Sequence, residues 1–93
     1  MKIARIYLGL SLGLGNQDPE EAKRLTAEHF DGATFFNAEG MWRGKLEKVL
    51  IIELWDRPVF GEAKIYALAN VLGHVYRQEN VAVVFTENDV VFV

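Results

Sequence analysis

The segment Met41-Trp42-Arg43-Gly44-Lys45 combines residue types that could contact a ligand. A Trp beside an Arg can stack on a planar or anionic molecule, and Lys45 adds a second positive charge. Trp and Arg are also the residue types that anchor subunit interfaces. Three interpretations therefore stay open: contact with a small anionic or planar ligand, an anchor between subunits, or a surface hairpin with Trp42 folded back on a sheet.

A second candidate, Asn16-Gln17, follows a glycine-rich stretch that includes Gly13 and Gly15. A dinucleotide-binding loop needs the spacing G-x-G-x-x-G at the start of a helix, and the third glycine is missing. Glu20 and Glu21 would also repel a phosphate at that helix start. We expect a plain turn whose two amides could bind a polar ligand. The candidate ligand-binding residues are Tyr7, Asn16, Gln17, Trp42, Arg43 and Lys45.

Residues for catalysis or metal binding do not gather into a pattern. His29 and His74 stand alone on helix-forming segments, and the chain has no cysteine. A zinc site needs several such ligands at set spacing. Ser11 lacks the glycine-flanked pattern of a hydrolase nucleophile. The sequence therefore predicts no catalytic residue, no metal site and no cofactor.

The composition predicts one cytoplasmic domain over residues 1–93. The 10 basic residues are scattered among 13 acidic ones, which argues against nucleic acid as a partner. No apolar run is long enough to cross a membrane, and the start of the chain lacks a signal-peptide pattern. The absence of cysteine is compatible with a reducing compartment.

The helices and strands that must position these residues can be predicted from the spacing of apolar residues and from the glycine and proline residues that interrupt it. The sequence predicts strands over 3–12, 33–39 (continuing over 41–43), 47–55, 81–86 and 90–93, and helices over 18–30 and 61–78. Asp18 and Pro19 suit a helix start, with Glu21 at capping-box spacing. Gly44-Lys45 is the expected hairpin bend.

This order predicts an α+β, ferredoxin-like β-α-β-β-α-β fold with a short extra C-terminal strand. Its antiparallel sheet carries both helices on one face. The strand over 47–55 is nevertheless apolar on both sides, and 51% of the chain is hydrophobic. We therefore expect a second copy to cover the free sheet face, which makes the protein a homo-oligomer.

Short motifs along these elements resemble an uncharacterised bacterial family, a domain of unknown function. They are Tyr7-Leu8-Gly9-Leu10, Gly32-x-Thr34, Ala38-x-Gly40-x-Trp42, Glu47-Lys48 and Tyr76-x-Gln78-Glu79-Asn80-Val81, beside the family's Y-F-G-L, G-L-T…G-x-W and Q-E-S-V. Asn80 replaces the usual Ser, and the first loop differs. The resemblance implies the fold and no activity. The layout is also similar to PII-like and ACT regulatory modules and to α+β-barrel monooxygenases.

These observations predict a non-enzymatic, oligomeric domain that binds a small ligand or a protein partner. The alternative is a small enzyme of the monooxygenase-like α+β-barrel type, with Tyr7, Phe36 and Trp55 lining a pocket between sheet and helices. A third possibility is a protein that sequesters a nucleotide signal or inhibits a larger machine. Nothing in the residues separates the third hypothesis from the first.

Overall fold

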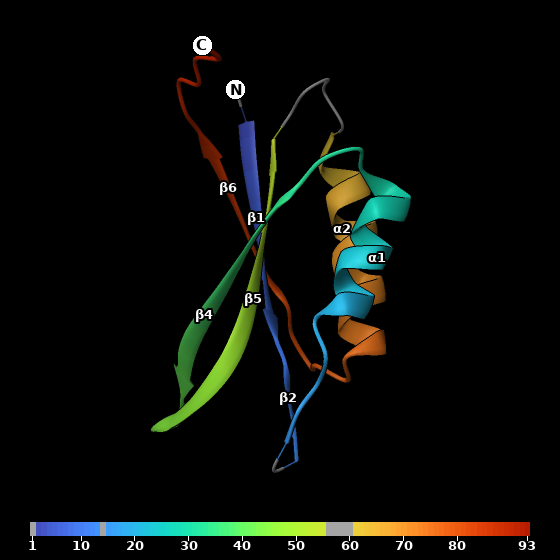
Figure 1. Ribbon diagram of the computed structural model, residues 1–93, viewed down its shortest axis with the longest axis vertical. Helices are drawn as coiled ribbons and strands as arrows, with labels where there is room; N and C mark the ends of the chain where they lie inside the picture. Colours follow the sequence, from blue (N-terminus) through green and yellow to red (C-terminus); the bar gives the residue numbers. More distant parts are fainter. Residues whose placement is uncertain (1, 14, 56–60) are drawn as a thin grey trace.

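The computed structural model describes residues 2–13, 15–55 and 61–93, which form an antiparallel sheet beside two helices. In chain order the elements are β1 (Lys2–Gly9), β2 (Ser11–Leu12), β3 (Gly15–Asn16), α1 (Glu20–His29), β4 (Thr34–Trp42), β5 (Lys45–Trp55), α2 (Gly61–Val75) and β6 (Ala82–Glu87). The main sheet has the order β4-β5-β1-β6, with every neighbouring pair antiparallel. Both helices lie on one side of it (Figure 1). The α+β prediction with a ferredoxin-like strand order is confirmed.

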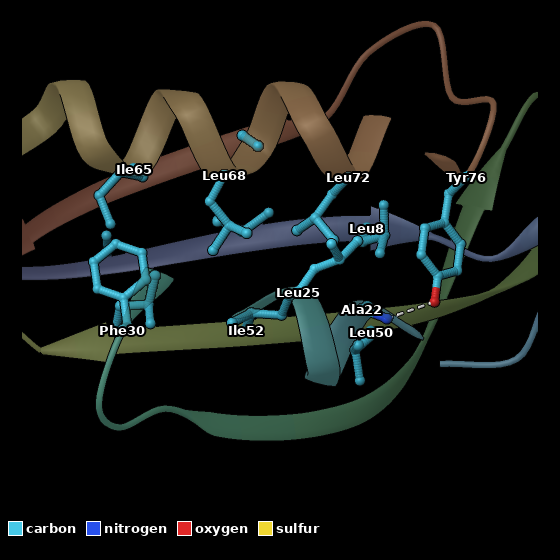
Figure 2. Packing of buried hydrophobic residues seen from close by; sticks show 14 of the residues in the cluster. Leu8, Ala22, Leu25, Phe30, Leu50, Ile52, Ile65, Leu68, Leu72 and Tyr76 are labelled. Carbon is cyan, nitrogen blue, oxygen red and sulfur yellow. Dashed lines mark hydrogen bonds between the residues drawn. The ribbon is translucent and has the colours of Figure 1, made fainter. Parts of the chain in front are cut away.

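Strand alternation divides the sheet into a buried face and an outer face. Ala4, Ile6 and Leu8 of β1 are fully buried toward the helices. They meet apolar side chains from α2 such as Leu68 and Leu72 (Figure 2). Burial of a Leu or Ile side chain stabilises a fold by about 1.5–3 kcal/mol, so this layer provides most of the driving force.

The packed core corrects one sequence expectation. Tyr7, Phe36 and Trp55 were expected to line a pocket between sheet and helices, but that layer is filled by the apolar cluster. Tyr7 and Phe36 both pair with Ile51, on the face away from the helices. Their alternation with the buried Ile6 and the partly buried Phe35, which both pack in the core layer, places them outside. The α+β-barrel pocket therefore has no counterpart in the described part of the chain.

The first predicted strand is shorter than expected, and the last one is not formed. The strand predicted over 3–12 ends at Gly9, and Ser11–Leu12 instead pairs with Gly15–Asn16 as a small hairpin. Gly13, at φ 60°, lies in the connecting turn, a conformation that glycine adopts at little cost. Residues 90–93 are not a strand. In that tail the Phe92 ring packs on Trp55 with centroids 5.6 Å apart.

The β4–β5 hairpin is longer and turns one residue earlier than predicted. Its two turn residues, Arg43 and Gly44, have φ values of 50° and 77°. Two successive positive φ values are the pattern of a type I′ turn, which matches the twist of a hairpin. β4 runs through Gly40 to Trp42 without a break. This hairpin and the β2–β3 hairpin both reach beyond the same end of the helices (Figure 1).

The start of α1 is held by a tyrosine from α2's C-terminal side. The Tyr76 hydroxyl accepts a bond from the Ala22 N–H at 2.8 Å and donates to the Asp18 carbonyl at 2.6 Å (Figure 2). Asp18 Oδ1 accepts from the Glu20 N–H, whereas Glu21 pairs with Arg24 rather than closing a capping box. Burial raises the pKa of Tyr76, so its hydroxyl stays protonated at neutral pH.

α2 also ends earlier than predicted, at Val75 rather than Gln78. Arg77, with φ 54°, takes the chain out of the helix and toward β6. The Gln78 N–H bonds to the Gly73 carbonyl at 2.9 Å, which closes the helix end. None of the described helices is long and apolar enough to cross a membrane.

Candidate functional site

A groove on the outer face of the sheet lies between the two hairpins. Its volume is about 590 Å³, within the range of about 300–1,000 Å³ that is usual for ligand pockets. The floor comes from β1 and β5, one wall from the β4–β5 hairpin, and the other from the β2 turn and the segment after α2. The lining residues are Tyr7, Gly9, Ser11, Leu12, Gly13, Trp42, Glu47, Val49, Arg77, Gln78, Glu79, Asn80 and Ala82.

Two glycines lie beside the carboxylate of Glu47 on the groove floor. Gly40 pairs with Glu47 across β4 and β5. A methyl group on Gly40 would lie 3.8 Å from Glu47 Oε1, and one on Gly9 would lie 3.5 Å from Glu47 Oε2. These are ordinary contact distances, whereas the tight neighbours of such methyl groups would be Val49 Cγ2, 3.0 Å from the one on Gly40, and Gln78 Oε1, 2.8 Å from the one on Gly9.

The amide of Gln78 is held in one orientation above Gly9. Its Nε2 donates to the carbonyls of Ser11 and Tyr76, each at 3.1 Å. Its Oε1 points to Gly9, where a methyl group would be only 2.8 Å away. Turning the amide over would bring Oε1 against two carbonyl oxygens, so the two bonds fix which atom faces the groove.

Trp42 forms the groove wall at the tip of the long hairpin. Trp42 is 67% exposed, and the Arg43 guanidinium lies over its ring with 5.4 Å to the ring centroid. Lys45 lies directly across from Trp42 in the β4–β5 register. Neither cation lines the groove. The hairpin thus presents an aromatic side chain to the groove and keeps its positive charges at the rim.

The structure brings together two of the six predicted ligand-binding residues. Tyr7 and Trp42 line the groove. Asn16 is exposed on β3, paired with Ser11. The Gln17 amide donates to the Tyr76 carbonyl at 2.7 Å, so it ties the first loop to the segment after α2.

The charges of the groove differ from those of the expected site. The groove is lined by two negatively charged carboxylates, Glu47 and Glu79, and by one positively charged guanidinium, Arg77. The expectation of an anionic ligand depended on Arg43 and Lys45, which lie outside it. Two carboxylates against one guanidinium, with an aromatic wall, suit a planar ligand that carries positive charge.

The outer face also holds a structural ion pair at the far end from the groove. Arg5 Nε lies 2.7 Å from Glu53 Oε2, and the Trp55 indole N–H donates to Glu53 Oε1 at 2.7 Å. Burial alone would raise the pKa of Glu53, but these two bonds and the Arg5 charge lower it. A smaller hollow of about 240 Å³ adjoins this pair.

Another groove of about 590 Å³ runs between α2 and the edge strand β6. Its polar side chains include Tyr66, Asn70 and His74, and it meets the first groove at residues 78–80. His74 is exposed there rather than directed into the core. Among the residues that the structure describes, no group of three or more His, Asp or Glu side chains could hold a metal ion.

Sequence reasoning missed Gly9, Glu47 and Gln78 as parts of a site. All three occur in the motifs that carry the family resemblance, on β1, β5 and the segment before β6. Glycine inside a strand often marks a close approach of another group, and this was the available signal for Gly9 and Gly40. That these three residues lie close together depends on the register of the strands, which the motifs do not reveal.

The fold is similar to solved structures of a phage SAM lyase. One, without ligand, has a TM-score of 0.78 and 23% identity over 91% of this chain and 78% of that one. Another, in complex with S-methyl-5′-thioadenosine, has a TM-score of 0.78 and 24% identity over 92% of this chain and 80% of that one. No protein-family model and no curated protein matches the chain. The resemblance to the uncharacterised bacterial family stays a prediction.

These neighbours correct the expected function. The sequence favoured a non-enzymatic, oligomeric binding domain, yet both similar structures belong to an enzyme. An enzyme therefore fits the fold better than a plain binding module. The prediction relied on the absence of a recognisable catalytic motif, and such an absence does not exclude an enzyme.

Proposed function

We propose that this chain is an enzyme that cleaves S-adenosylmethionine as a lyase, with the outer-face groove as its active site. The observation that carries the proposal is the fold match to a phage SAM lyase that binds S-methyl-5′-thioadenosine. The proposal goes beyond the fold, since a fold can host several activities. Support from this chain's own residues therefore matters.

The groove matches the chemistry of such a substrate. Trp42 and Tyr7 offer aromatic faces on which an adenine ring can stack. The sulfonium of S-adenosylmethionine is a cation, and both an aromatic face and the Glu47 carboxylate attract it. The volume of about 590 Å³ is ample for a nucleoside with a short side chain.

The reaction requires little from the protein beyond binding and orientation. When S-methyl-5′-thioadenosine leaves, the bond between sulfur and the methionyl Cγ breaks and its electron pair goes to sulfur. The four-carbon fragment must then lose a proton or form a bond within itself, and no water or cofactor is consumed. A groove that fixes the substrate's conformation and shields it from water can accelerate such a step.

Direct product analysis tests the proposal. Purified protein is incubated with S-adenosylmethionine alone, and chromatography with mass spectrometry follows both substrate and S-methyl-5′-thioadenosine. We expect one nucleoside product per substrate lost, at a rate well above spontaneous decay, and at least a tenfold lower kcat/KM for Trp42→Ala. Arg24→Ala, on the exposed side of α1, is the control and should keep the wild-type rate. Folded protein that leaves the substrate at its spontaneous rate would contradict the proposal.

A second part of the proposal concerns assembly and location. We retain the homo-oligomer formed through the outer sheet face, because Phe36 is 45% exposed and Val84 40% exposed on that face. Apolar side chains exposed together are typical of contact surfaces. The cytoplasmic location also stays part of the proposal.

A further inference from the structure

We infer that Gln17 and Gln78 are positioning residues, whose side-chain amides hold the β2–β3 hairpin against the segment after α2. We call these two amides, together with the carbonyls of Ser11 and Tyr76 that they bind, the amide clasp. The inference rests on the proposed function, because the clasp fixes one wall of the proposed active site. Neither amide has to touch the reacting atoms in this role.

The clasp is centred on the Tyr76 carbonyl. Gln17 Nε2 donates to it at 2.7 Å, and Gln78 Nε2 donates to it at 3.1 Å. Gln78 Nε2 also donates to the Ser11 carbonyl at 3.1 Å. A carbonyl oxygen accepts two bonds and an amide nitrogen donates two, so the Tyr76 oxygen and the Gln78 nitrogen are both fully used. The bonds join the hairpin to a segment that lies far from it in the sequence.

The outer part of the hairpin depends on this clasp. The base of the hairpin is anchored, because Leu10 is buried and its N–H donates to a carbonyl of β5 at 2.9 Å, and the Gln17 N–H donates to the Leu10 carbonyl at 2.7 Å. Beyond the base, no described residue of the hairpin is buried. Within that described part, the one hydrogen bond to another element is the bond from Gln78 to the Ser11 carbonyl. The amides therefore determine where this part of the hairpin lies.

The same part of the hairpin belongs to a wall of the groove. Ser11, Leu12 and Gly13 line the groove beside the segment after α2, whereas Trp42 belongs to the other wall. A ligand between the walls takes an orientation that depends on where the hairpin lies. A displacement of about 1 Å at an active site can lower a rate about a hundredfold. Loss of the clasp should therefore slow the reaction while the protein stays folded.

A glutamate in place of Gln17 should make activity depend on pH. The protonated carboxyl group of Gln17→Glu can donate to the Tyr76 carbonyl, whereas the ionised form cannot and is repelled by it. We expect kcat/KM for S-adenosylmethionine, relative to wild type at the same pH, to fall about tenfold between pH 5 and pH 8. In Gln17→Met, which has no donor, the ratio should be low throughout. Asn37→Asp adds a carboxyl group at an exposed position outside the groove and should keep a ratio near one.

Hydrogen exchange followed by mass spectrometry reports on the hairpin without any substrate. In Gln17→Met the backbone amides of residues 10–17 should exchange about threefold faster or more, while those of β5 and α2 keep their wild-type rates. Gln78→Met should have the same effect on the hairpin. The double variant should lose little more kcat/KM than the worse single variant, because both amides hold one unit. Thermal unfolding checks that each variant is folded.

Unchanged hairpin exchange in Gln17→Met would overturn the clasp. A pH-independent ratio for Gln17→Glu, or losses in Gln17→Met and Gln78→Met that simply add, would show that the two amides act separately and would overturn it as well. S-adenosylhomocysteine, a stable analogue without the sulfonium methyl group, separates the clasp from the proposed function. If wild-type protein neither cleaves S-adenosylmethionine nor binds this analogue while hairpin exchange responds as expected, the proposed function fails and the clasp stands.

Discussion

Gly9 is the position at which one methyl group should separate ligand binding from folding. In Gly9→Ala the new Cβ would lie 2.8 Å from Gln78 Oε1, so the amide of this groove residue must shift from its position. We expect ligand affinity to fall about tenfold or more, while stability changes by less than about 1 kcal/mol, since a flexible side chain can yield. Calorimetry with S-adenosylhomocysteine and urea unfolding measure the two effects.

Gly32→Ala is the matched control for that substitution. Nothing lies within 4 Å of the Cβ position at Gly32, which is exposed and outside the groove. Both affinity and stability should remain at wild-type values. An unchanged affinity in Gly9→Ala would show that the orientation of Gln78 has no part in binding.

Glu53 should make the stability of the protein depend on acid pH. Its pKa is lowered in the folded state, because the Trp55 and Arg5 bonds outweigh burial. The unfolded state therefore binds the proton more readily, so this stabilisation is present above an unfolded pKa near 4.5 and is lost as pH falls through the folded pKa. Denaturant unfolding between pH 7 and pH 3 measures the loss.

In Glu53→Gln this acid-dependent loss should be smaller than in the wild type. At pH 7 the variant should be less stable by about 1–3 kcal/mol, because hydrogen bonds to a charged group are replaced by weaker ones. Glu28→Gln, at an exposed position of α1, is the control and should lower the free energy of unfolding by less than about 0.5 kcal/mol. Parallel pH profiles for wild type and Glu53→Gln would contradict the role given to the pair.

At the scale of elements, Tyr76 joins the start of α1 to the end of α2. Tyr76→Phe removes the hydroxyl that accepts from the buried Ala22 N–H and donates to the Asp18 carbonyl. We expect a loss of about 1–3 kcal/mol, the cost of leaving a buried donor unpaired. Thermal or urea unfolding checks it. Tyr66→Phe, which keeps the ring contact with Phe85 on the exposed side of α2, should be nearly neutral.

Periodicity predicted the main helices and strands because each buries one regular stripe of apolar residues. Leu68 and Leu72 recur at helical spacing, and Leu50 and Ile52 alternate along a strand, so sequence and structure agree there. The structure departs from the sequence prediction where contacts between residues far apart in the chain determine the local structure. Tyr76 replaced the expected capping box at α1, and the tail residue Phe92 packs on Trp55 without forming a strand. Neither contact has a local sequence signal.

At the scale of the whole molecule, the site was only partly accessible to sequence reasoning. Trp42 stood out because it lies beside Arg43 and Lys45 at an expected hairpin bend, and these residue types can contact a ligand. Glu47 and Gln78 did not stand out, because in the sequence each is an ordinary polar residue. Only the β4–β5–β1 register and the path of the segment after α2 place both side chains next to Gly9. A groove made by four separate segments is a property of topology, so it follows from the fold rather than from any motif.

The outer sheet face gives the last prediction, which concerns assembly. Phe36, Trp42 and Val84 are exposed on this face, opposite the core layer that the helices cover. If a second copy covers it, Phe36→Glu places a charge in an apolar contact and should dissociate the oligomer at micromolar concentration. Met41→Glu is the matched control, because Met41 lies on the same strand but on its other face. Sedimentation velocity should show monomer for Phe36→Glu and oligomer for wild type and Met41→Glu. A monomeric wild type at this concentration would rule out self-association and leave the groove to function within a single chain.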